Sequence, residues 1–156
     1  MSLSAQTYLE VQDHILRFWA VVDEVDDTPG AALFTSDGAL VIETFRATGT
    51  EELTRYFDAR RTLSAERQRG TRHLCTNLRM LPGEHVRMAG TITVFSGVGT
   101  RPLPLEAPSS LADFTFDCIQ TPDGWRFREI HGALVFTGSD TPDLKKATAA
   151  AKGEPT

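Results

Sequence analysis

Hydrophobic positions recur at helical spacing near the start of the chain. Between Thr7 and Asp23, apolar and aromatic side chains return every three or four residues, and polar side chains fill the opposite positions. This pattern predicts an amphipathic helix. Thr28 and Pro29 then form a start signal for a short second helix, because Thr caps a helix and Pro suits its first position. Gly38 closes a turn signal that ends this helix.

A strand and a third helix follow this turn. The segment from Ala39 to Phe45 is rich in apolar and β-branched residues, which predicts a strand. The third helix is expected to begin near Thr48, with Glu51 at capping-box spacing, and to fade near Leu63. Its apolar side chains share one face: Leu53, Tyr56 and Phe57.

The period of alternation changes to two from Thr71 onward. Four strands are predicted, at about 71–81, 85–95, 111–120 and 124–136. Turn signals at Pro82-Gly83 and Pro122-Asp123-Gly124 join them as two hairpins. The long connection 96–110 is expected to be a lid, an interface arm or a loose loop. Helices first and strands afterwards is an α+β order, in which helices cover one face of an antiparallel sheet.

Composition narrows the class of protein. The 156 residues are 40% apolar and 24% charged, which fits one domain over 1–137 without a membrane span. Past Phe136 the chain is polar and alanine-rich, so we expect a flexible tail over 138–156. The start of the chain lacks an export signal, so a cytoplasmic location is expected.

Charge and reactive residues remove several classes of partner. The net charge of −5 disfavours nucleic acid as the partner. Arginines do gather between 55 and 72, but Asp58 and Glu66 interrupt them, and a solvated helix face is the simpler interpretation. Cys75 and Cys118 lie in apolar stretches and are interpreted as small buried hydrophobes. The sequence shows no ligand spacing for a metal and no phosphate loop, so we predict no metal and no cofactor.

Two strings of residues resemble signatures of one family. Residues 72–77 read Arg-His-Leu-Cys-Thr-Asn, similar to the Arg-His-x-x-Thr-Asn strand of SnoaL-like proteins, a branch of the NTF2-like superfamily. Residues 121–126 read Thr-Pro-Asp-Gly-Trp-Arg, similar to the turn before that family's last strand. The resemblance covers about residues 5–136. It implies a cone-shaped NTF2-like α+β fold, in which a curved antiparallel sheet wraps around N-terminal helices.

The relatives include scytalone dehydratase, bile acid 7α-dehydratase, polyketide cyclases, steroid isomerases and the β subunits of ring-hydroxylating dioxygenases. Most of these bind apolar rings, and the β subunits are largely structural. The resemblance therefore implies a pocket for a small apolar or aromatic ligand.

Asp23 is the first candidate for catalysis. Steps of four residues from Val11 lead through Ile15 and Trp19 to Asp23, which places a carboxylate in line with the apolar helix face. A buried carboxyl group can act as a general acid or base. Alternatively, Asp23 lies at the helix end and makes turn contacts. The resemblance favours the catalytic role, because the family's dehydratases carry an acid at the matching position.

His73 is the second candidate. Strand alternation places His73 on one face with Cys75, Asn77 and Arg79, and apolar residues on the other. If the polar face lines the pocket, the apolar face is exposed unless a second copy covers it, which predicts a homodimer through the sheet. The alternative is a surface histidine. The resemblance implies that His73 pairs with the helix acid, as in dehydratases.

Further residues are expected to line the pocket or bind the ligand. His131 alternates with aromatic residues on the last strand and could face the pocket, although a core histidine bonded to the backbone is the more common case. Val22 and Phe114 stand where dehydratase relatives carry tyrosines, which removes donors for a carbonyl oxygen. The expected ligand-binding residues are Phe18, Trp19, Phe34, Phe45, Phe57, Asn77, Phe114, Trp125, Phe127 and His131.

The function expected from these observations is a lyase or isomerase that acts on an apolar ring without a cofactor. His73 would be the base, oriented by Asp23, as in a dehydratase, cyclase or isomerase. The alternative is a non-catalytic module of the same fold that binds a ligand or assembles subunits.

Overall fold

A curved sheet of six strands forms the frame of the protein in a computed structural model, which describes residues 4–138 and 143–155. The strand order is β2-β1-β6-β5-β4-β3, and the sheet is not closed into a barrel. Along the chain the elements are α1 (Ala5–Val22), the 3-10 turn η1 (Gly30–Leu33), β1 (Phe34–Ile42), β2 (Phe45–Thr48), α2 (Gly49–Arg67), β3 (Arg69–Leu81), β4 (Val86–Val98), β5 (Ser110–Thr121), β6 (Gly124–Thr137) and α3 (Leu144–Lys152).

One strand pairing differs from the expected antiparallel sheet. β3, β4, β5 and β6 form an antiparallel meander, but β1 pairs with β6 in parallel. The reason is the path of the chain, which leaves β2 through α2 and enters the sheet again at its far edge with β3. The last strand therefore returns to the side of β1, and the sheet is mixed.

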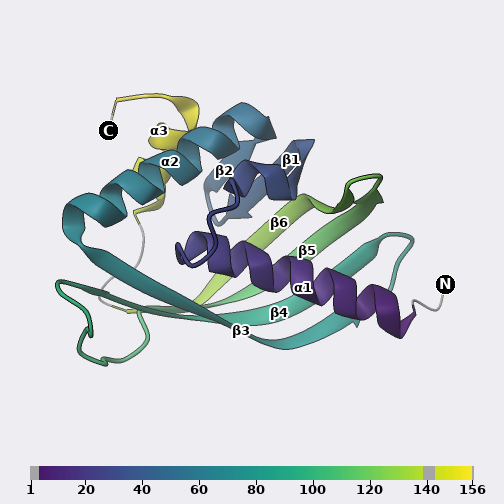
Figure 1. The fold of residues 1–156 in the computed structure, drawn as a ribbon, viewed down its shortest axis with the longest axis horizontal. Helices are drawn as coiled ribbons and strands as arrows, with labels where there is room; N and C mark the ends of the chain where they lie inside the picture. Colours follow the sequence, from purple (N-terminus) through teal and green to yellow (C-terminus); the bar gives the residue numbers. More distant parts are fainter. Residues whose placement is uncertain (1–3, 139–142, 156) are drawn as a thin grey trace.

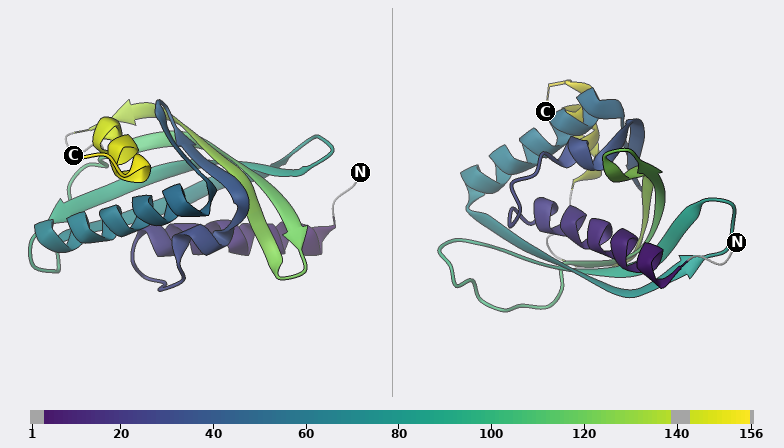
Figure 2. Two further views of the ribbon diagram at one scale, coloured as in Figure 1. Left: turned by 90° about the horizontal axis from the view of Figure 1, so that it is seen from above. Right: turned by 45° about the vertical axis from the view of Figure 1, so that its right-hand side comes forward.

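Helix α1 fills the concave side of the sheet, and α2 lies beside it at one end (Figures 1 and 2). The predicted amphipathic helix is confirmed, because Val11, Ile15 and Phe18 on its apolar stripe are at most 1% exposed. Ser4 caps the helix through a hydrogen bond that its Oγ accepts from the backbone N–H of Thr7. The core thus lies between α1 and the inner face of the sheet.

A bulge in β3 changes which side chains face inward. Asn77 has a positive φ of 55°, and the pairing register with β4 shifts between Thr76 and Arg79. Before the bulge His73 and Cys75 face the inside, and after it Leu78 packs against the core. The extra residue reverses the alternation of side chains after the bulge. β3 therefore lacks the single polar face that alternation predicts.

The C-terminal segment forms a helix where a polar tail is expected. Asp143 caps α3 by accepting hydrogen bonds from two backbone N–H groups of its first turn, and Gly153 ends the helix in a left-handed conformation. Leu144, Ala147 and Ala151 share one face and pack on the hydrophobic core. The helix therefore contributes to the inside of the cone (Figure 2).

Within residues 4–138 and 143–155, the helices fall short of the length and apolar character that a membrane crossing requires.

Candidate active site

Asp23 caps the C-terminus of α1 and points at β3. Its side chain is 5% exposed and accepts three hydrogen bonds: from Thr71 Oγ1 (2.7 Å), from the backbone N–H of His73 (2.7 Å) and from His73 Nδ1 (2.6 Å). Burial opposes ionisation, but the bonds from His73 and Thr71 outweigh it, so the pKa of Asp23 is lowered. The turn contacts considered from the sequence are replaced by contacts to β3, and Asp23 is an ionised acceptor.

The imidazole of His73 lies between this carboxylate and a tryptophan. Its ring stacks on Trp19 with centroids 4.8 Å apart and planes 15° from parallel. A carboxylate can only accept, so Nδ1 carries the proton that it donates to Asp23, and Nε2 is left with a free lone pair. Burial lowers the pKa of His73 more than Asp23 raises it. The histidine is therefore neutral at pH 7 with a basic nitrogen.

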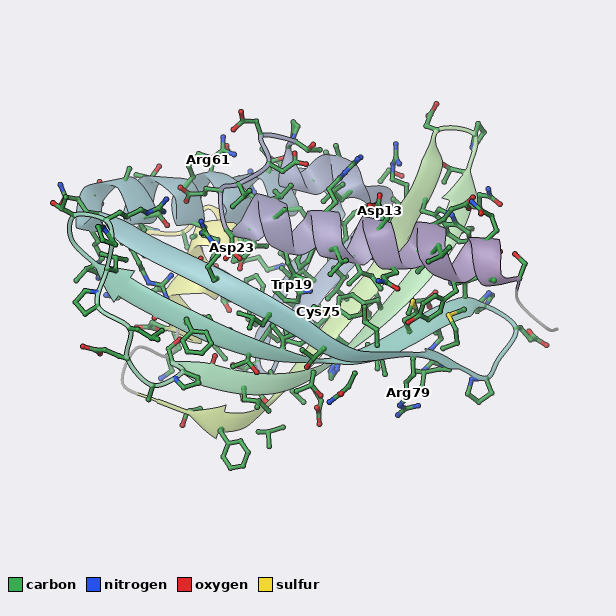
Figure 3. All side chains as sticks on the ribbon, turned by 60° about the horizontal axis from the view of Figure 1, so that its bottom comes forward. Asp13, Trp19, Asp23, Arg61, Cys75 and Arg79 are labelled. Carbon is green, nitrogen blue, oxygen red and sulfur yellow. The ribbon has the colours of Figure 1, made fainter. Side chains whose placement is uncertain are left out.

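A cavity of about 90 Å³ lies next to His73, between the two long helices and the inner face of the sheet. Figure 3 shows Trp19, Asp23 and Cys75 together between α1 and the sheet, with Asp13 on the opposite side of α1. Most of the lining is aliphatic or aromatic: Phe18, Trp19, Val22, Leu40, Ile42, Phe45, Tyr56, Ile92, Val94, Ala112, Phe114, Leu134, Leu144 and Ala147.

Few polar groups reach this cavity besides His73. They are Tyr56 and Arg60 from α2 and Ser110 from β5. The Cys75 thiol lies beside the indole of Trp19, and burial raises the pKa of this thiol to about 11. A protonated thiol is a poor nucleophile, so the chemistry that this site favours is proton transfer rather than covalent attack.

The structure brings together some of the residues expected in the pocket and separates others. Phe18, Trp19, Phe45 and Phe114 line the cavity with His73. Gly132 leaves room for the ring of Phe114, because a Cβ at residue 132 would lie 2.5 Å from this ring.

The other expected ligand-binding residues lie elsewhere. Phe34 and Phe127 are buried in the packed core, and Phe57 packs against Phe18 and Tyr56 outside the cavity lining. Trp125 donates its indole N–H to Glu10 on the surface of α1. Asn77 and His131 are exposed and do not reach the cavity: Asn77 lies in the β3 bulge, and His131 pairs opposite Thr115 on the outer face of the sheet.

Arg60 lines the cavity, although the cluster of arginines around it predicts a solvated helix face. Leu53, Tyr56 and Phe57 form the apolar stripe of α2, and Arg60 continues it at helical spacing. The same rule that singles out Asp23 on α1 would have found Arg60. The cluster of arginines around it hid this signal.

His14 is a second buried histidine. It is 8% exposed, although its neighbours on α1 suggest a solvated position. Nε2 donates to the backbone carbonyl of Leu33 at 3.1 Å, and the ring contacts Phe127. Burial lowers the pKa of His14 to about 4.

A metal site is not apparent in the described part of the chain, where no three His, Cys, Asp or Glu side chains stand close enough to share an ion.

Comparison with known proteins gives one family. Residues 4–131 match the family described as the SnoaL-like domain. No curated protein matches the chain significantly.

Solved structures share the fold. A putative scytalone dehydratase from Novosphingobium aromaticivorans superimposes with a TM-score of 0.71 at 14% identity, covering 88% of this chain and 90% of that one. ActVI-ORFA from Streptomyces coelicolor has a TM-score of 0.70 at 19% identity, over 85% of this chain and 99% of that one. A protein of unknown function with a cystatin-like fold from Nostoc punctiforme has a TM-score of 0.66 at 24% identity, covering 92% and 98%. At these identities the likeness concerns the fold alone.

Proposed function

The chain belongs to the SnoaL-like domain family, and we propose that it is a lyase or isomerase that moves a proton on a small ring ketone without a cofactor. The observation that carries this proposal is the hydrogen bond of 2.6 Å between His73 Nδ1 and Asp23, beside an apolar cavity that His73 lines. A neutral histidine that lines a cavity and keeps an unprotonated nitrogen is suited to general base catalysis.

In the proposed reaction, Nε2 of His73 takes the proton from the carbon next to the ring carbonyl. The electron pair of that C–H bond moves into the carbonyl and forms an enolate. In a dehydration, the enolate then expels a β-hydroxyl group, which leaves as water with the proton from the imidazolium. Asp23 holds the ring in one tautomer and stabilises the imidazolium between the two steps.

Tyr56 supplies one donor for the carbonyl oxygen in this proposal. Val22 and Phe114 stand where dehydratase relatives carry tyrosines, so neither position supplies a phenol. Tyr56 lines the cavity from α2 and offers a phenol from a different element.

The test is turnover of single-ring substrates by matched variants. Wild-type protein should catalyse deuterium exchange next to the carbonyl of cyclohexanone, or loss of water from 3-hydroxycyclohexanone. His73→Gln should lower the rate by roughly 10²- to 10⁴-fold, which is the usual contribution of a general base. Asp23→Asn should also lower it, because an amide no longer fixes the tautomer.

The pH profile gives an independent readout of the same base. The pKa of His73 lies below its ordinary value of 6.5, so the rate should be full at pH 7 and fall as the pH drops below 6.5. His85→Gln is the control, since His85 is exposed in the β3–β4 turn. Unchanged rates in both site variants would remove the pair from the mechanism.

The second candidate function is a non-catalytic module that binds a small ligand. The lining of the cavity favours it, because ligand sites are mostly apolar with a small number of polar groups, and this cavity has that composition. Ligand binding without turnover by wild-type protein would support this module.

We also propose that two copies associate through the outer face of the sheet. Leu74, Thr93, Leu111 and Phe136 pair in one row across four strands, and the outer ends of the row are 47% and 68% exposed. A row of this kind is covered in many assemblies by a second copy of the chain.

Sedimentation at micromolar concentration tests this association. Wild-type protein should have the mass of a dimer, and Phe136→Asp should have the mass of a monomer, because the charge would be buried unpaired. Leu9→Asp is the control, since Leu9 is 58% exposed on α1. A monomeric wild type would exclude the association.

A further inference from the structure

Arg60 brings a positive charge to an otherwise apolar cavity. It lines the cavity with His73, and its Nε donates a hydrogen bond to the carbonyl of Val22 at 3.3 Å. Its charge is also close enough to His73 to lower the pKa of the imidazole. The guanidinium therefore lies near the C-terminus of α1, on the same side of the cavity as the proposed base.

No carboxylate neutralises this charge within the described residues, 4–138 and 143–155. Asp23 accepts hydrogen bonds from Thr71 Oγ1, from the backbone N–H of His73 and from His73 Nδ1, and it forms no ion pair with Arg60. By contrast, Arg55 on the same helix pairs with Glu51, and Lys152 of α3 pairs with Glu52. Arg55 and Lys152 thus have acidic partners, whereas Arg60 has none among the described residues.

An unpaired guanidinium at an apolar wall is costly, because taking a charge out of water is offset only by an opposite charge or by hydrogen bonds. Arg60 uses Nε for the Val22 carbonyl, which leaves its terminal N–H groups to bind another partner. The planar fork of these groups matches the two oxygens of a carboxylate.

We propose that Arg60 binds the carboxylate of the ligand, so that the cavity selects a single ring that carries a negative charge. One ring is the upper limit, because about 90 Å³ is smaller than the ~150 Å³ cavity that holds benzene in an engineered protein, and binding of a ring requires the lining side chains to move apart. This inference rests on the proposed function because it uses the same cavity, but it does not require catalysis there. It narrows the ring ketones of the proposed function to those that also carry a carboxylate.

Benzoate and benzamide are the probes, because they have the same ring and nearly the same shape but differ in charge. The chain has two tryptophans, and only Trp19 lies at the cavity, whereas Trp125 is bonded to Glu10. In a spectrum of the indole N–H groups, benzoate should shift the Trp19 signal and leave the Trp125 signal in place. Wild-type protein should bind benzoate at least about tenfold more tightly than benzamide.

Variants of two neighbouring arginines isolate the role of the charge. Arg60→Gln should weaken benzoate by at least about tenfold and change benzamide by less than about twofold. Arg60→Lys should keep part of the preference, because it keeps the charge but not the fork. Arg61→Gln is the matched control, since Arg61 is exposed on the side of α2 that faces away from the sheet (Figure 3).

Several outcomes would overturn the inference. Equal binding of the two probes, or no shift with millimolar benzoate, excludes a carboxylate site. An Arg60→Gln protein that is less stable but keeps the preference makes Arg60 only a cap for the last carbonyl of α1. An equal loss in Arg61→Gln assigns the effect to general surface charge. Failure of the proposed catalysis is separate, because it would show as no turnover by wild-type protein or as an unchanged rate in His73→Gln, and neither would alter the preference for benzoate.

Discussion

Two histidines are buried along the inside of the same cone, and they have opposite surroundings. The ring of His14 is bonded to a backbone carbonyl and packed on Phe127, which also contacts the ring of Phe18. The ring of His73 is bonded to a buried carboxylate and lies at a cavity. Burial lowers the pKa of both.

The difference between them shows that a shifted pKa does not make a catalytic base. A base also needs space for a substrate beside its free nitrogen and a partner that stabilises its charged form. His73 lines a cavity and is bonded to Asp23, which supports the role proposed for it. His14 has a neutral partner and lies outside the lining of this cavity, and its protonation opposes folding.

The region around His14 and Phe127 should respond most strongly to truncation of a side chain. Phe127→Ala removes a ring that is 0% exposed and contacts His14, Phe18, Phe34 and Phe116. It should lower the free energy of unfolding by about 3–5 kcal/mol, measured by urea denaturation. Ile119→Ala is the control at a 42% exposed position and should cost far less. A loss below ~1 kcal/mol would mean that this region is not packed as described.

The pH dependence of stability should separate the two histidines by a smaller amount. The pKa of His14 is about 4 in the folded chain and near 6.5 when unfolded, so the unfolded chain binds more protons between these values. Stability from this group is full above pH 6.5 and falls as the pH drops toward 4. Between pH 7 and pH 5 it accounts for about 2 kcal/mol.

His14→Gln tests this assignment, because the amide can still donate to the carbonyl of Leu33 but does not titrate. The variant should lose about 2 kcal/mol less than wild type between pH 7 and pH 5 in urea denaturation. Its turnover should match wild type, since His14 lies outside the cavity lining. An equal acid loss in both proteins would assign the pH dependence to other groups.

Sequence patterns were sufficient for most of the elements. Periods of 3.6 and 2 predicted α1, α2 and the four strands of the meander, because these periods follow from local backbone geometry. The apolar stripe of α1 also led to Asp23. For the same reason the stripe of α2 contained Arg60, although it was not recognised there.

Other features depend on contacts between distant segments, and local pattern does not determine them. The bulge at Asn77 changes the phase of β3, so Asn77 is exposed although alternation groups it with His73. Leu144 is the one large apolar residue of helix α3, whose other apolar residues are alanines, and the helix is stabilised by packing on the hydrophobic core. His131 lies on the outer face of the sheet. β6 is paired with β1 on one side and β5 on the other, and its opposite face packs on the core.

The sequence by itself determined the family, the α+β order and the two residues proposed for proton transfer, because each is encoded in a local period or string. Only the tertiary structure decided that Asp23 and His73 meet, that Arg60 joins them, and that the remaining space is about 90 Å³. These properties arise where α1, α2, α3 and the sheet pack together, and packing depends on side chains that are far apart in the sequence.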